Sequence, residues 1–463
     1  MCRLTDMTDK CLTHGTVLFA GLALIALPAP APAQCQPAKL VAPDGATDDL
    51  FAFSVATSAA TVVVGTPFDD DNGSASGSAR VFGHDPNGAW IEVAKLLADD
   101  GAESDQFGWS AAIAGRAVVV GAHYDDDFGT RSGSAYVFER DPNGVWSQTA
   151  KLLPDDGEEY ELFGSAVGIA GDLIIVGAPH DDDNGYRSGS AYVFGRDPNG
   201  AWLQTAKLLA DDGEPYDKFG SCVAIDGDVA VMGAPYDQDQ GDYSGSAYVF
   251  ERDADGAWSQ ASKLLPHDGA AFWNFGETVA LNGNCALVGA PTAFAFAPAG
   301  GAAYIFERDP NGGWPEVAQI VSDDVATADS FGASVALDGD LAVVGAWGDD
   351  DHGQHSGSAY VFVRQPDGSW PQVAKLVPDE GAPDDYFGAA VAVSGHTGVI
   401  GAYLDDDQGE DSGSAYVFNV GPDEDGDGVM DVCEDSPGVP IAGPKRAASR
   451  SDGRAASEGA VAP

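Results

Sequence analysis

The hydrophobic and polar positions of this chain repeat with a period of 56 residues, the interval from Phe51 to Phe107. Each copy opens on a phenylalanine, and the seven are Phe51, Phe107, Phe163, Phe219, Phe275, Phe331 and Phe387. An apolar run that ends in glycine follows, then a run similar to Ser-Ala-Tyr-Val-Phe. Seven copies in register, without an insertion, predict a repeat architecture of seven equal units.

Each copy contains four short strand candidates. In the third copy the predicted strands are Phe163 to Ile169, Leu173 to Gly177, Ser190 to Phe194 and Trp202 to Leu209. Tight turns separate the first strand from the second and the third from the fourth, which is typical of antiparallel neighbours. Such units repeated around an axis predict an all-β fold, a seven-bladed β-propeller of four-stranded antiparallel blades. The alternative is an open β-solenoid, whose coils are usually shorter and contain fewer hairpins.

The two ends of the repeat array complement each other. The fourth predicted strand carries a Lys-Leu pair in most copies, and Lys39-Leu40 stands at the matching position before the first phenylalanine. The seventh copy has no fourth strand after Phe418. We therefore predict that Ala38 to Val41 completes the last blade beside Ser414 to Phe418, which removes two free sheet edges.

Phe163-Gly164, Gly177-Ala178-Pro179 and their equivalents resemble FG-GAP repeats. Such repeats form the seven-bladed propeller of integrin α subunits and of many secreted bacterial proteins, and the resemblance covers residues 36–418. Integrin-type repeats often carry a calcium loop between the FG strand and the GAP strand. Here that connection is only a Gly-Asp turn, as at Gly171-Asp172, so that calcium site is not transferred and the chain is more similar to the bacterial short-turn variety.

The N-terminus predicts export. Arg3 and Lys10 precede an apolar run, Val17 to Leu27, that is too short to span a bilayer, and Ala31-Pro32-Ala33 offers a small-residue cleavage site. We expect residues 1–33 to be a signal peptide, the alternative being a transmembrane anchor or a buried helix. The mature protein is then secreted and extracellular, at the cell surface or in the periplasm.

The charge balance narrows the choice of partners. Asp plus Glu number 73 and Lys plus Arg 22, which gives a formal net charge of −51. So acidic a protein is repelled by nucleic acid and by anionic membranes, and no later stretch is apolar enough to insert. We expect a monomer with cations, basic surfaces or neutral ligands as partners, and neither a nucleic-acid partner nor membrane insertion.

Acidic loops recur between the second and third strands. The strand order places these loops on the same side as the links between blades, which are also acidic. Carboxylates at positions i and i+2 followed by glycine suit a hard cation such as Ca²⁺. The loop residues that this pattern marks as candidate cation ligands are Asp69, Asp71, Asp125, Asp127, Asp181, Asp183, Asp237, Asp239, Asp349, Asp351, Asp405 and Asp407. The alternative is a solvated acidic face that keeps the protein soluble.

A stronger calcium signal follows the propeller, in residues 421–435. A twelve-residue loop has acidic side chains at positions 1, 3, 5, 9 and 12 and glycine at position 6, which is the spacing of a calcium loop. The predicted ligands are Asp423, Asp425, Asp427, the Val429 carbonyl, Asp431 and Glu434. The alternative is an acidic linker. The string also resembles one thrombospondin type 3 repeat, a calcium-binding spacer.

The chain ends contain two further features. Residues 436–463 are rich in Ala, Ser, Pro, Gly and Arg and predict a disordered tail. Cys35 precedes the closing strand and Cys433 follows the last blade, so a disulfide between them would join the calcium loop to the ring closure. The alternative is two free thiols.

Two departures from the repeat are candidate ligand contacts. The residue after the Phe-Gly step varies most, and Trp109 and Glu277 occupy it in two copies. In the fifth copy the segment from Thr292 to Ala297, which contains Phe294 and Phe296, replaces the acidic loop of the other copies. Shape filling at the first position and a loop folded on its neighbour at the second are the alternatives.

No catalytic constellation is apparent, since the histidines do not recur in phase and no known catalytic motif is present. We therefore expect a non-enzymatic binding or adhesion protein, calcium-dependent, with an extracellular protein or glycan as ligand. The alternatives are a carbohydrate-active lyase or hydrolase on the same scaffold, or a structural coat component. A channel on which His, Tyr, Arg and carboxylate groups converge would favour the enzyme, and a filled channel lined by small residues would favour binding.

Overall fold

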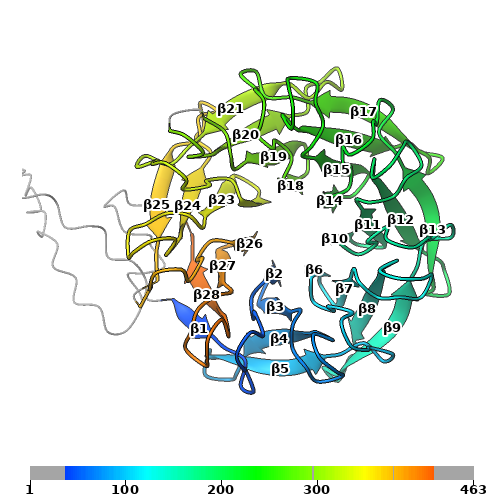
Figure 1. The fold of residues 1–463 in the computed structure, drawn as a ribbon, viewed down its shortest axis with the longest axis vertical. Helices are drawn as coiled ribbons and strands as arrows, with labels where there is room; N and C mark the ends of the chain where they lie inside the picture. The colour runs from blue at the N-terminus through cyan, green and yellow to red at the C-terminus, as the bar shows by residue number, and fades with distance from the viewer. Residues whose placement is uncertain (1–36, 295–296, 379, 422–463) are drawn as a thin grey trace, which may run out of the picture. The chain divides into compact units, whose positions relative to one another are not determined.

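The computed structural model describes residues 37–294, 297–378 and 380–421, which form seven four-stranded antiparallel sheets arranged as blades in a ring (Figure 1). In blades 1 to 6 the chain runs from the innermost strand to the outermost. In the part of the chain that the structure describes, no helix is long or apolar enough to cross a membrane.

The strands keep nearly the same bounds from one blade to the next. Blade 1 contains β2 (Ser54–Ser58), β3 (Thr61–Thr66), β4 (Ser78–His84) and β5 (Trp90–Leu96). Blade 2 contains β6 (Ser110–Ala114), β7 (Ala117–Ala122), β8 (Ser134–Arg140) and β9 (Trp146–Leu152). Blade 3 contains β10 (Ala166–Ala170), β11 (Leu173–Ala178), β12 (Ser190–Arg196) and β13 (Trp202–Leu208). Blade 4 contains β14 (Cys222–Asp226), β15 (Val229–Ala234), β16 (Ser246–Arg252) and β17 (Trp258–Leu264).

The remaining three blades follow the same plan. Blade 5 contains β18 (Thr278–Asn282), β19 (Cys285–Ala290), β20 (Ala302–Glu307) and β21 (Glu316–Ile320). Blade 6 contains β22 (Ser334–Asp338), β23 (Leu341–Ala346), β24 (Ser358–Val363) and β25 (Gln372–Leu376). Blade 7 contains β26 (Ala390–Ser394), β27 (Thr397–Ala402), β28 (Ser414–Asn419) and, as its outermost strand, β1 (Ala38–Leu40).

The Phe-Gly step does not belong to the first strand, contrary to the predicted bounds, because it joins two blades. The Phe163 N–H donates to the Ser132 carbonyl of the preceding blade at 2.9 Å, and Gly133 and Phe163 form a parallel bridge. Gly164 then has a φ of +89°, a conformation that glycine adopts without strain. The extended strand β10 therefore begins only at Ala166.

The hydrophobic core lies between neighbouring blades. Phe163 is fully buried and packs edge-on against Phe194, with ring centroids 6.0 Å apart. Val119 and Leu152 of blade 2 and Val176 of blade 3 belong to the same cluster. Because every blade is covered on both faces, its second and third strands contain consecutive buried residues instead of an alternating pattern.

The ring closes as predicted. Strand β1 pairs with β28 in the register Ala38↔Val417, Lys39↔Tyr416 and Leu40↔Ala415. Leu40 is 3% exposed and packs in one cluster with Phe51 of blade 1. The first strand of the propeller thus completes its last blade, and β28 has a paired strand on both sides.

We predict that Leu40→Ala destabilises the protein by roughly 2–5 kcal/mol, because it leaves a cavity at the ring closure. The matched control is Leu203→Ala, since Leu203 is 54% exposed on the outermost strand of blade 3 and should change stability by less than about 0.5 kcal/mol. Urea unfolding followed by tryptophan fluorescence measures both variants. Equal effects of the two substitutions would contradict a closure that depends on Leu40.

Candidate functional site

The loops between second and third strands and the links between blades lie on one side of the ring, which we call the loop face. Lys151 of β9 shows this arrangement. Its Nζ lies 2.7 Å from Asp100 in the link between blades 1 and 2, 3.1 Å from Asp125 and 2.5 Å from Asp127, both in the loop after β7. The Tyr136 hydroxyl donates to Asp125 at 2.6 Å, and the Asp125 side chain is 7% exposed.

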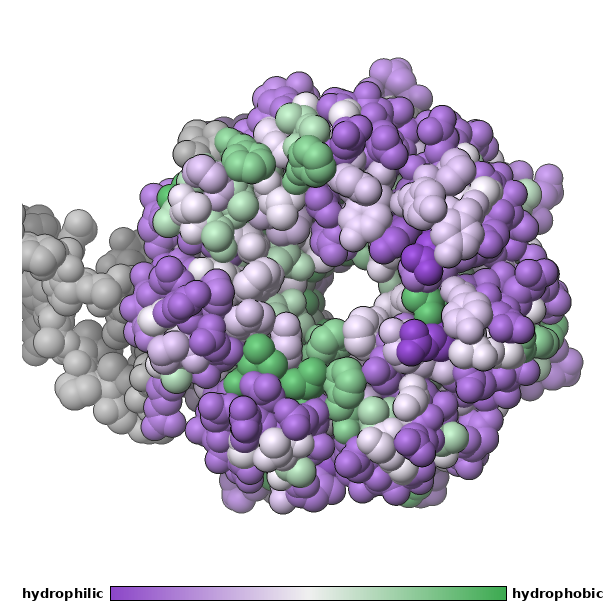
Figure 2. Space-filling model, in the orientation of Figure 1, coloured by the Kyte–Doolittle hydropathy of each residue, from purple (hydrophilic) through white to green (hydrophobic). Residues whose placement is uncertain are grey.

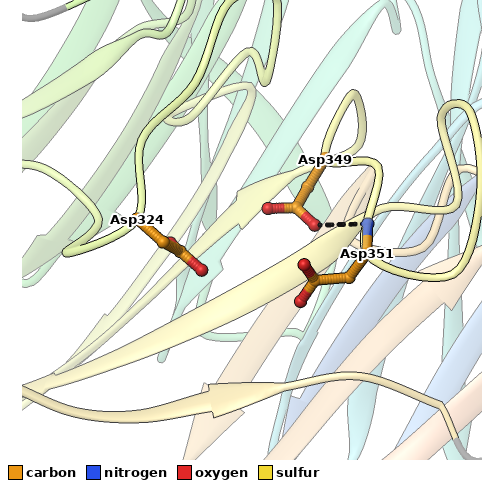
Figure 3. A group of neighbouring side chains, drawn as sticks. All are labelled: Asp324, Asp349 and Asp351. Atoms are coloured by element: carbon orange, nitrogen blue, oxygen red, sulfur yellow. Dashed lines mark hydrogen bonds between the residues drawn. The ribbon is translucent and has the colours of Figure 1, made fainter.

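The same group recurs around the ring, and Figure 3 shows its three carboxylates in blade 6, where they lie close enough together to share one cation. Lys375 Nζ lies 2.7 Å from Asp324, 3.0 Å from Asp349 and 2.6 Å from Asp351. The equivalent groups are Lys39 with Asp405 and Asp407, Lys95 with Asp44, Asp69 and Asp71, Lys207 with Asp156, Asp181 and Asp183, and Lys263 with Asp212, Asp237 and Asp239.

Cation binding at these loops stays a prediction, and the structure adds one observation to it. The twelve aspartates predicted as cation ligands surround lysine ammonium groups of the chain itself. Burial alone would lower the pKa of the Lys151 ammonium, but its hydrogen bonds to Asp100 and Asp127 raise that pKa above the usual value. The lysine stays charged, and it neutralises part of the acidic loop without an added metal.

Blade 5 supports this role of lysine, because it lacks both charges. Ala293, fully buried, stands at the position of the first loop aspartate, and Gln319 replaces the lysine. The Gln319 amide donates to the Tyr304 hydroxyl at 2.9 Å and to Asp268 at 3.2 Å. Where the loop carboxylates are absent, a neutral side chain thus occupies the position of the ammonium group.

We predict that Lys207→Gln destabilises the protein by roughly 1–3 kcal/mol, because Asp181, whose side chain is 1% exposed, loses its charge partner. The triple variant Asp181→Ala, Asp183→Ala, Lys207→Gln reproduces the residues of blade 5 and should recover most of that loss. Thermal unfolding compares the single and triple variants. If the triple variant unfolds below the single variant, the pairing of loop aspartates with lysine is not what stabilises this region.

A second set of carboxylates lies buried in the links between blades. Burial raises the pKa of Asp49, Asp105, Asp217 and Asp385 to about 6 and that of Glu161 to about 7, although each accepts a hydrogen bond from a backbone N–H. The Asp105 carboxylate, for example, accepts from the Ala102 N–H at 2.7 Å. These groups therefore lose their protons near neutral pH, well above the pH at which exposed carboxylates do so.

We predict that stability falls as pH rises from about 4 to about 7. The folded state binds the protons of these five carboxyls more tightly than the unfolded chain, so folding is favoured below the raised pKa values. Burial lowers the pKa of His123 to about 3 and that of His180 to about 4. These two histidines make stability rise with pH, but they are fewer than the five carboxyls. Urea midpoints at pH 4.5, 6 and 7.5 test the direction, and Glu161→Gln should flatten the profile. A profile that rises steadily with pH would contradict it.

The ring has an open hole at its centre, the mouth of the channel (Figure 2). Trp109, one of the predicted ligand contacts, lies against Phe53 of the neighbouring blade with ring centroids 4.5 Å apart. The His123 ring also packs against Trp109, with ring centroids 4.1 Å apart. His123 is 3% exposed, and its Nδ1 atom has no hydrogen-bond partner among the described residues. Sequence reasoning missed His123, although it replaces the proline of the Gly-Ala-Pro step.

Glu277, the second predicted contact at this position, is exposed. Desolvation by the surrounding protein raises the pKa of its carboxyl, and the charge of Lys218 lowers it in part. Lys218 in turn lies over the Tyr236 ring, with its Nζ 4.3 Å from the ring centroid. The structure thus brings Glu277 into the same electrostatic environment as a lysine and a tyrosine that sequence reasoning did not select.

Exposed aromatic side chains gather on the loop face. Phe128 (44%) lies in blade 2, and six others, which we call the aromatic sector, lie in blades 3 to 5 and the links that precede them. Its members and exposed fractions are Tyr160 (52%), Tyr186 (51%), Tyr216 (52%), Tyr243 (43%), Phe272 (55%) and Phe294 (54%). The Tyr186 and Tyr216 rings meet edge to face, with their centroids 5.3 Å apart, and the ring centroids of Tyr243 and Phe272 are 5.9 Å apart. Phe294 alone was predicted as a contact from its departure from the acidic pattern.

Three aromatic residues of this sector occupy one repeat position with a fixed backbone conformation. Tyr160, Tyr216 and Phe272 have φ values of +68°, +75° and +68°. The equivalent residues of other blades, Asp48, Ser104, Ala328 and Asp384, share this left-handed conformation. The conformation therefore belongs to the link in every blade, and only the side chain that it presents to solvent differs.

Several predicted site residues lie outside the described residues. These are the calcium ligands Asp423, Asp425, Asp427, Val429, Asp431 and Glu434, the contact Phe296, and the cysteines Cys35 and Cys433. Within the described ranges Cys222 and Cys285 are free thiols. The calcium loop, the disulfide, the signal peptide and the tail thus stay predictions.

The blades, their closure and the acidic loop face define a seven-bladed β-propeller built from one repeated unit. The model of the FG-GAP repeat matches residues 35–82, 90–138, 146–194, 202–250, 258–306, 314–362 and 370–418. The chain therefore belongs to the FG-GAP repeat family, as its resemblance predicted. No curated protein matches the chain.

Two solved structures resemble the chain at low sequence identity. One is a protein from Lactobacillus plantarum, with 15% identity and a TM-score of 0.46, covering 73% of this chain and 86% of that one. The other is a periplasmic gluconolactonase from Pseudomonas aeruginosa, with 16% identity and a TM-score of 0.47, covering 71% of this chain and 86% of that one.

The prediction that the protein is not an enzyme was wrong as an inference, because it rested on the absence of a familiar catalytic motif. A repeated scaffold without a familiar motif is no evidence against catalysis, since active sites are placed on folds independently of their architecture. The likeness itself assigns no activity to this chain.

Proposed function

We propose that this protein is a secreted propeller that binds a saccharide chain on its loop face, across the aromatic sector. The exposed rings of Tyr160, Tyr186, Tyr216, Tyr243, Phe272 and Phe294 are the observation that carries the proposal. A monomeric acidic surface has little need for six large exposed rings within three blades, and such a patch marks an interaction site.

The chemistry of the sector favours a saccharide over an apolar partner. Four of the six rings are tyrosines, which present a flat apolar face together with a hydroxyl that forms hydrogen bonds. The pyranose ring of a sugar has the complementary surfaces, with C–H groups on its faces and hydroxyls at its edge. The edge-to-face contact between Tyr186 and Tyr216 holds neighbouring platforms at an angle, which suits a chain of linked sugars more than one flat ligand.

Export and calcium belong to the same proposal. The signal peptide predicted in residues 1–33 would place the loop face outside the cytoplasm, where polysaccharides are accessible. A calcium ion held by Asp423, Asp425 and Asp427 of the predicted loop would lie close in sequence to the closing blade. Binding is therefore expected to be stronger in millimolar calcium than in a chelator.

We predict that the double variant Tyr186→Ala, Tyr216→Ala binds polysaccharide at least about tenfold more weakly, because aromatic side chains contribute most of the energy at such contacts. Leu203→Ala is the control, since Leu203 is as exposed as the two tyrosines but lies on the outermost strand of blade 3, outside the aromatic sector. Affinity electrophoresis in neutral and acidic polysaccharides, with and without calcium, measures the binding. Release of shorter saccharides would show that the bound chain is also a substrate.

Failure of the parent protein to bind any polysaccharide in either condition would overturn the proposal. Binding that is unchanged in the double variant but lost in Leu203→Ala would place the binding surface elsewhere. Unchanged thermal unfolding of both variants shows that any loss of binding is local.

A further inference from the structure

Three cations on the loop face differ from most others in the described chain. Lysines and arginines of the blades mostly form ion pairs, as Lys151 does with Asp125 and Arg196 does with Glu139. Arg131, Arg187 and Lys218 form no ion pair with any described residue. In a protein with a net charge of −51, unpaired cations on the acidic face are an exception that needs a reason.

Each of the three cations lies over a tyrosine ring. The Arg131 guanidinium is 4.2 Å from the Tyr124 centroid, and the Arg187 guanidinium is 5.1 Å from that of Tyr186. Lys218 lies 4.3 Å from the Tyr236 centroid. A tyrosine face orients a cation without neutralising it, so these side chains keep their charge available to a ligand.

The chain places the three cations in neighbouring blades. Arg131 and Arg187 occupy the same position in the loops of blades 2 and 3, and Lys218 lies in the link to blade 4. The Lys218 N–H donates to the Arg187 carbonyl at 3.2 Å, so these two residues are adjacent. The charge of Arg187 acts against the protonation of both Lys218 and His180, and that of Arg131 acts against the protonation of His123.

The nearby carboxylates do not neutralise these cations by direct contact. Asp126 accepts a hydrogen bond from the backbone N–H of Arg131 at 2.7 Å, and Asp182 accepts one from that of Arg187 at 2.6 Å. These bonds fix the loops and leave both guanidinium groups without a carboxylate partner. Glu277 acts on Lys218 through its charge, but no ion pair joins them.

We propose that Arg131, Arg187 and Lys218 bind carboxylate groups of an acidic polysaccharide whose sugar rings stack on the aromatic sector. This inference rests on the proposed saccharide binding and specifies its ligand class. Arginine presents a planar fork that matches a carboxylate in two hydrogen bonds, and lysine adds a point charge. The surrounding acidic surface repels a polyanion, so it would bind only where these cations and the rings coincide.

The test compares polygalacturonate with neutral galactan and with poly-L-glutamate as probes. The triple variant Arg131→Gln, Arg187→Gln, Lys218→Gln should bind polygalacturonate at least tenfold more weakly and galactan as the parent does. The matched control is Arg140→Gln, because Arg140 is also exposed and without an ion pair in the described chain but ends β8, away from the loop face. Arg131→Gln alone should weaken polygalacturonate binding in the same direction by a smaller factor.

The outcomes separate this inference from the proposed function. If the triple variant keeps polygalacturonate binding while Tyr186→Ala, Tyr216→Ala loses it, the cations are not the recognition element and this inference alone fails. If poly-L-glutamate binds as tightly as polygalacturonate, the ligand is not defined by its sugars and the inference also fails. If the parent binds neither polysaccharide, the proposed function fails with it.

Discussion

The architecture depends on one close approach of backbone to backbone at every junction between blades. At Gly133 a Cβ atom would lie 2.0 Å from the Phe163 carbonyl oxygen, and at Gly121 it would lie 2.0 Å from that of Gly164. No residue with a side chain fits at either position. The contact seats the phenylalanine between the blades, and its hydrogen bond to Ser132 fixes the spacing. Each junction has the same glycines and phenylalanine, so the same contact recurs at every period of 56 residues.

That spacing creates an electrostatic problem that lysine resolves. Links and second-to-third loops meet on one face, and both are rich in aspartate, so neighbouring carboxylates would repel. In blades 1 to 4 and 6 a lysine on the outermost strand reaches the link and the loop together, as Lys151 does with Asp100 and Asp127. The combined loss of acid and base in blade 5 indicates that the two charges are retained as a set.

The sequence alone was sufficient for the repeat, the four strands of each blade, the closing strand and the family. All of these depend on periodicity, which one chain displays seven times. The lysine groups escaped prediction because their partners lie 51 and 26 residues away, as Asp100 and Asp125 do from Lys151, and only the folded geometry shows which loop each lysine reaches. The unpaired state of Arg131 and Lys218 is likewise a property of distances and not of spacing.

The aromatic sector and the three unpaired cations share a feature that explains why they can vary. At the positions of Tyr160 and Arg131 the backbone adopts the same left-handed conformation in other blades, which carry different side chains. Tyr160 and Arg131 are both exposed, so their identity does not affect the packing of Phe163 or the glycines. A repeat that is rigid at its junctions can therefore change its exposed residues blade by blade without loss of the ring. Recognition on such a scaffold belongs at the departures from the repeat, and in this chain three aromatic departures and three unpaired cations occupy adjacent blades on one face.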